Sequence, residues 1–153
     1  MGSYKCETYT KWKGEKKGRS SAPDKPDIEV AAPPELKGHF GVWTPKEMLI
    51  AACESDMMLT FLALADQAGL KVVSYESRAV AELEGDPASP QLLKVDIYPD
   101  VEVTSKGDKA LKILSKLQES CLTAGSLKAQ VHVYPKLRAT SARRSEKIIH
   151  PEP

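Results

Sequence analysis

The first residues of the chain alternate between two kinds of side chain, as in a β-strand with one charged face. One face carries Tyr4, Cys6, Thr8, Thr10 and Trp12, and the other carries Lys5, Glu7, Tyr9, Lys11 and Lys13. This period of two predicts a half-buried antiparallel strand over residues 4–12. Glycines at 14 and 18 predict a turn and a polar return to residue 21. A short strand is then expected over 28–31, and a loop over 35–43.

The clearest local signal marks the start of a long helix. Thr44 suits the N-cap, Pro45 suits the first helical position, and Glu47 completes a capping box with Thr44. The helix is expected to end just before Gly69.

This helix is apolar nearly all round over residues 48–52 and 57–65. A helix of that kind is buried on most sides, so we expect it to be central to the fold. A chain of 153 residues has little else with which to cover it. Burial against a second copy in a homodimer is the simplest remedy, because two-fold dimers are the commonest oligomers.

Two strands, a second helix and a last strand are expected after the long helix. The strands cover residues 71–83 and 91–103. Asp108 is expected to cap the helix, which runs to about Cys121 and is ended by Gly125, and the last strand covers 126–134. This order predicts an α+β fold with largely antiparallel sheets. We expect one domain over residues 1–135. Residues 136–153 then form a basic tail that is either disordered or docked on the partner subunit.

Composition narrows the classes of function. Lys+Arg 22 against Asp+Glu 21 give a net charge of +1, which argues against a nucleic-acid partner. The longest apolar run, residues 57–65, is about half of what a membrane span needs, and the polar N-terminus has no signal pattern. Three cysteines without CxxC spacing favour the cytoplasm and argue against a disulfide scaffold. The scattered histidines predict no metal site, and no motif indicates a cofactor.

Several segments carry a further signal in their order and spacing. They are Trp12-Lys13-Gly14 with Gly18, residues 33–38 (PPELKG), 43–49 (WTPKEML), 57–65 (MMLTFLALA), Gly69-Leu70, Glu119-Ser120-Cys121 and 126–129 (SLKA). Together they resemble the OsmC/Ohr superfamily, the osmotically inducible protein C and organic hydroperoxide resistance proteins. These are thiol-dependent hydroperoxide reductases of the oxidative-stress response with a peroxiredoxin-like activity. The resemblance implies an intertwined homodimer with antiparallel sheets around a long central helix and a second helix, and with sites at the subunit boundary.

The resemblance also implies where the catalytic groups of the family fall. The resolving cysteine falls on Cys121, but the peroxidatic cysteine falls on Asp56. The family's glutamate falls on Lys46, beside Glu47, and its arginine falls near Lys16. A carboxylate cannot attack a peroxide as a thiolate does, so this arrangement predicts that the family chemistry is lost.

Two functions follow from this comparison. In the first, the chain is a binding or structural relative with a degenerate peroxidatic site, which takes a small apolar or hydroperoxide ligand at the subunit interface. In the second, Cys53, one helical turn before Asp56, acts with Cys121 as an active peroxide reductase that a dithiol regenerates. Under the first hypothesis, Asp56 is expected to pair with Lys46 or Lys16, within the chain or across the dimer. The alternative is that it faces a solvent-filled cleft unpaired.

Overall fold

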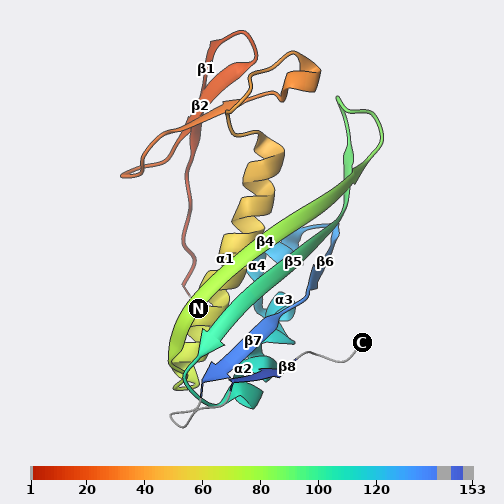
Figure 1. The fold of residues 1–153 in the computed structure, drawn as a ribbon. Helices are drawn as coiled ribbons and strands as arrows, with labels where there is room; N and C mark the ends of the chain where they lie inside the picture. Colours follow the sequence, from red (N-terminus) through yellow and green to blue (C-terminus); the bar gives the residue numbers. More distant parts are fainter. Residues whose placement is uncertain (1, 141–145, 150–153) are drawn as a thin grey trace. The chain divides into compact units, whose positions relative to one another are not determined.

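The computed structural model describes residues 2–140 and 146–149. Contacts group the described chain into two compact units (Figure 1). Unit 1 contains residues up to 49 together with 86–89, and unit 2 contains residues 50–85 and those from 90 onward. That residues 1–135 form one domain remains a prediction.

Unit 1 contains a three-stranded antiparallel sheet, coloured red to orange in Figure 1. Its strands are β1 (Tyr9–Gly14), β2 (Lys17–Ser21) and β3 (Ile28–Ala31), followed by the 3₁₀ turn η1 (Pro34–Leu36). The expected third element, residues 28–31, is confirmed. The first strand, however, begins at Tyr9 rather than at residue 4, and it is exposed rather than half-buried: the Trp12 side chain is 74% exposed.

The long helix α1 (Pro45–Gln67) starts and ends where the sequence predicts. Glu47 Oε2 accepts hydrogen bonds from Thr44 N and Thr44 Oγ1, and Thr44 Oγ1 in turn accepts one from Glu47 N. The capping box is therefore confirmed. At the other end Gly69 takes a φ of 63°, and its N–H donates to Asp66 O, as in a left-handed helix cap.

Burial of α1 within the chain is narrower than the sequence predicts. Only Cys53, Met57, Phe61 and Ala65 are buried, which is a single stripe at intervals of one turn. Leu59, on another face, is 59% exposed. The single chain thus buries only one stripe of α1, and burial of its other faces in a homodimer remains a prediction.

The sequence predicts that no apolar run is long enough to span a membrane, and α1 contradicts this prediction. By length and composition alone this helix could cross a membrane. The core helices of many globular proteins meet the same criterion, so the observation carries no conclusion about a membrane.

Unit 2 is built on a five-stranded sheet. Its strands are β4 (Val72–Glu84), β5 (Gln91–Val103), β6 (Gln130–Val133), β7 (Lys136–Thr140) and β8 (Glu146–Ile149). The strand order is β4-β5-β7-β8, with β6 also paired to β5. β4 and β5 form the long antiparallel hairpin of Figure 1, but β6 and β7 both run parallel to β5. The largely antiparallel sheet predicted from the sequence is therefore mixed, because the helices between β5 and β6 form a crossover connection.

Three short helices replace the single helix expected over 108–121. They are α2 (Gly107–Leu114), α3 (Leu117–Ser120) and α4 (Leu122–Ser126). Asp108 lies inside α2 rather than at its cap, Cys121 is extended between α3 and α4, and Gly125 lies inside α4. One face of the sheet, the buried stripe of α1 and these helices enclose one core: Cys53, Met57, Phe61, Ala65, Leu70, Val95, Ile97, Val101, Val103, Ala110, Leu114, Leu117, Cys121, Ala124 and Leu137.

The predicted basic tail needs correction at its beginning. Residues 136–140 form β7, which pairs with β5, and Leu137 in β7 is fully buried. β8 pairs antiparallel with β7. The remainder of that prediction, residues 141–145 and 150–153, lies outside the described residues.

Candidate functional site

The centre of the candidate site is the carboxylate of Asp56, which projects from α1 in unit 2. Its Oδ2 atom accepts hydrogen bonds from Thr123 N and Thr123 Oγ1, each at 3.0 Å, and from Cys121 Sγ at 3.1 Å. The N–H of Thr123 lies at the start of α4, where helical N–H groups have no partner in their own helix. Asp56 therefore caps α4 from a distant part of the chain.

Cys121 is the first member of this cluster that the sequence singled out. It is extended, with φ −90° and ψ 122°, and only 3% exposed. Its Sγ lies 3.2 Å from Thr123 Oγ1 as well as 3.1 Å from Asp56 Oδ2. Because a carboxylate can only accept, the proton of that contact resides on the sulfur.

Cys53 lies on the buried stripe of α1 and is fully buried. It is near enough to Cys121, Asp56 and Glu54 for negative charge on each of them to raise the pKa of its thiol. Burial is the larger cause of that rise. Cys53 and Cys121 both carry free thiols. Cys53 and Cys121, which the second hypothesis pairs in catalysis, thus lie in one cluster, and both are in the reduced form.

The cluster favours a carboxylate next to protonated sulfur. The hydrogen bond from the Thr123 backbone N–H, joined by that from the Cys121 thiol, holds the pKa of the Asp56 carboxyl below its ordinary value. Burial raises the pKa of the Cys121 thiol, and Asp56 adds to the rise. At neutral pH Asp56 is therefore ionised and Cys121 is not. That is the opposite of the charge state that a reactive cysteine needs.

The partners of Asp56 within unit 2 are Thr123 and Cys121, which are uncharged at neutral pH. Among the described residues of unit 2, no lysine, arginine or histidine makes a salt bridge with Asp56. Lys46 Nζ instead donates to Pro87 O at 3.4 Å, and Lys16 Nζ donates to Leu36 O at 2.6 Å, both in unit 1. Because both lysines lie in unit 1 and Asp56 lies in unit 2, the pair within the chain remains a prediction. The alternative of an acid without partners is wrong, since Thr123 donates to Asp56. The version across a dimer remains a prediction.

Two further side chains, Ser77 and Tyr75, lie beside the cluster without having been predicted. Ser77 in β4 donates to Glu54 Oε1 at 2.6 Å. The ring of Tyr75 packs on Phe61 at 5.7 Å, and its buried hydroxyl has no partner among the described residues. Burial, with negative charge on Glu54, raises the pKa of Tyr75 to about 12. No sequence signal could have found them, because their position depends on how β4 packs against α1.

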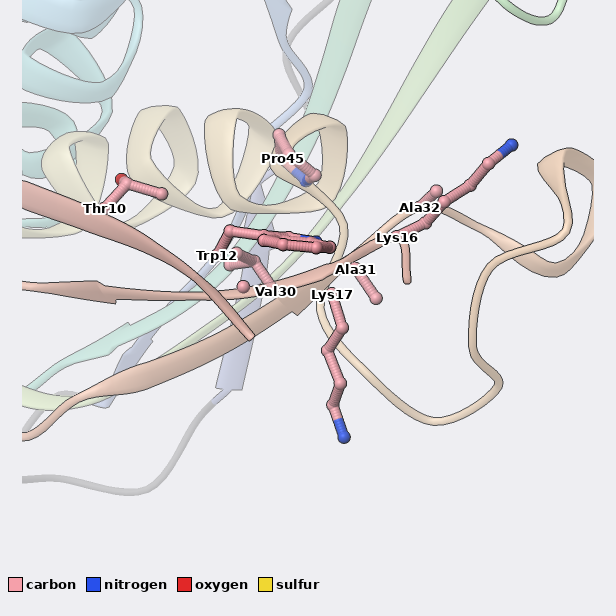
Figure 2. A pocket seen from close by; sticks show the side chains of 9 residues that line it. Thr10, Trp12, Lys16, Lys17, Val30, Ala31, Ala32 and Pro45 are labelled. Carbon is pink, nitrogen blue, oxygen red and sulfur yellow. The ribbon is translucent and has the colours of Figure 1, made fainter. Parts of the chain in front are cut away.

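Of the other predicted residues, Lys16 lines a shallow groove in unit 1 (Figure 2), whereas Lys46 and Glu47 do not. Its cavity volume is about 390 Å³, and its apolar surface comes from Trp12, Val30, Ala31, Ala32 and Pro45. In Figure 2 the Trp12 ring is seen edge-on, and the ammonium ends of Lys16 and Lys17 extend away from it in different directions. Glu47 is engaged with Thr44 in the capping box.

Metal ligands do not gather anywhere in the part of the chain that the structure describes. No group of three or more His, Cys, Asp or Glu side chains in residues 2–140 and 146–149 is placed to hold a metal ion.

Solved structures with the same arrangement identify the fold. An OsmC-like protein of unknown function from Vibrio cholerae superposes with a TM-score of 0.76 over 87% of this chain and 99% of its own, at 22% identity. The chain has the OsmC-like fold. An OsmC-like protein from Mycoplasma pneumoniae matches at TM-score 0.75, with 11% identity over 88% of this chain and 97% of its own. An organic hydroperoxide resistance protein from Elizabethkingia anophelis matches at 0.69, with 13% identity over 91% and 98%.

Sequence comparison adds nothing to the structural likeness. No family model matches the chain, and no curated protein matches it. The OsmC-like fold predicted from the order of the sequence motifs is therefore confirmed by structure alone. Asp56, at the centre of the cluster, lies on α1, the helix to which the resemblance assigns the peroxidatic cysteine.

Proposed function

We propose that this chain is an OsmC-like binding protein in which the thiol peroxidase centre has been replaced by the hydrogen-bonded Asp56 cluster. The observation that carries the proposal is that one oxygen of Asp56 accepts the thiol of Cys121 together with two donors of Thr123. A carboxylate satisfied in this way is a structural acceptor. It has neither the nucleophilicity nor the redox chemistry of a peroxidatic sulfur.

The charges around the cluster support the same conclusion. Reduction of a hydroperoxide begins with a thiolate, and a nearby cation normally stabilises that thiolate. Here the pKa values of Cys53 and Cys121 are both raised, with burial as the main cause. The charged neighbours, Asp56 and Glu54, are negative and disfavour a thiolate further.

A homodimer is the second part of the proposal. α1 exposes Leu59 at 59% on a face other than its buried stripe, and Trp12 in unit 1 is 74% exposed. Exposed large apolar side chains of this kind are typical of surfaces that a partner covers. A small apolar ligand at the subunit interface would then contact apolar side chains from both copies.

The oligomeric state can be tested at Leu59. Because this side chain is exposed, Leu59→Glu leaves the fold of the chain intact and places a charge on the proposed interface. Light scattering after size-exclusion chromatography is expected to give a dimer for the wild type and for a Gln67→Glu control, and a monomer for Leu59→Glu. A wild-type monomer at tens of micromolar would remove this part of the proposal.

Thiol counting separates the binding protein from an enzyme. In a Cys6→Ser background, Cys53 and Cys121 are the remaining thiols. After one equivalent of cumene hydroperoxide we expect both to be retained. Cys53 and Cys121 share one cluster, which is what favours the alternative of an active reductase. In that case one thiol would be oxidised to a sulfenic acid with release of the alcohol, and the other would close the disulfide with release of water. Loss of both thiols, abolished by either Cys53→Ser or Cys121→Ser, would establish that alternative.

A further inference from the structure

We draw no further inference here: the strongest candidate, the aromatic surface patch of the unit 2 sheet in which Tyr98 stacks on Tyr134 at 5.2 Å and Arg78 lies over the Tyr98 ring, carries no proposal, because these side chains already contact one another and nothing in the structure shows what covers the patch.

Discussion

Asp56 Oδ2 lies 3.1 Å from Cys121 Sγ, although the two residues are 65 positions apart in the chain. The same oxygen accepts the backbone N–H of Thr123. One carboxylate thus fixes the start of α4 against α1 and retains the proton on the sulfur next to it. Stability and thiol chemistry are coupled through this single atom.

Replacing Asp56 by Asn is expected to lower the free energy of unfolding at pH 7 by about 1–3 kcal/mol, the usual cost of weakening hydrogen bonds to a charged acceptor. The pKa of Asp56 is lowered in the folded state. Its contribution is therefore present above the unfolded pKa, near 4, and is lost as pH falls through the folded pKa. Urea titrations at pH 7 and at pH 3 measure the difference.

The exposed Asp66, on the same helix, provides the control for this measurement. Asp66→Asn is expected to change stability by less than about 0.5 kcal/mol at either pH. Equal stability of Asp56→Asn and Asp66→Asn at pH 7 would mean that the cluster contributes nothing to the fold.

Asp56→Cys tests whether this position is the one from which a sulfur could act. Because Asp56 Oδ2 is already 3.1 Å from Cys121 Sγ, a sulfur introduced here is expected to come within bonding reach of Cys121. In a Cys6→Ser, Cys53→Ser background, one equivalent of hydroperoxide should produce an intramolecular disulfide, detected by mass spectrometry without reductant. The same background with Asp56 retained should keep its thiol. A variant that remained reduced would show that the resemblance assigns the peroxidatic cysteine to the wrong position.

Tyr75→Phe addresses the hydroxyl that has no partner. Removing a buried unpaired hydroxyl is expected to leave stability at pH 7 unchanged or slightly higher. The folded pKa of Tyr75 is raised to about 12, so ionisation in the unfolded state destabilises the wild type as pH rises above about 10. At pH 11 the free energy of unfolding of the variant should therefore rise by about 1.4 kcal/mol relative to that of the wild type. Tyr4→Phe, at an 83% exposed site, should show no such gain.

Features fixed by neighbouring residues were predictable from the sequence, and α1 is the example. Thr44 and Glu47 are three residues apart, and their capping hydrogen bonds need no other part of the chain. The break at Cys121 was not predictable. The buried positions Ala110, Leu114, Leu117, Cys121 and Ala124 keep a helical spacing across it. The hydrogen bond at the start of α4 joins the Thr123 N–H to the carboxylate of Asp56, which lies 67 positions earlier in the chain.

The same distinction applies to the candidate site. The resemblance pointed to Asp56 and Cys121, which the structure does bring together. It also pointed to Lys16 and Lys46, which the structure places in other hydrogen bonds. Tyr75 and Ser77 entered only through the packing of β4 on α1, which no local pattern encodes.

β7 was missed because its pattern resembles a solvated tail. Lys136 and Arg138 are exposed or half-buried and pair with Asp100 of β5 at 3.0 and 3.1 Å, while Leu137 between them points into the core and is fully buried. Leu137→Ala is therefore expected to lower the free energy of unfolding by about 2–5 kcal/mol. Lys136→Ala, which removes only a surface ion pair, should cost less than about 1 kcal/mol. If urea titration gave equal, small losses for both variants, residues 136–140 would be an appendage, as the sequence predicted, and the sheet of unit 2 would be stable without them.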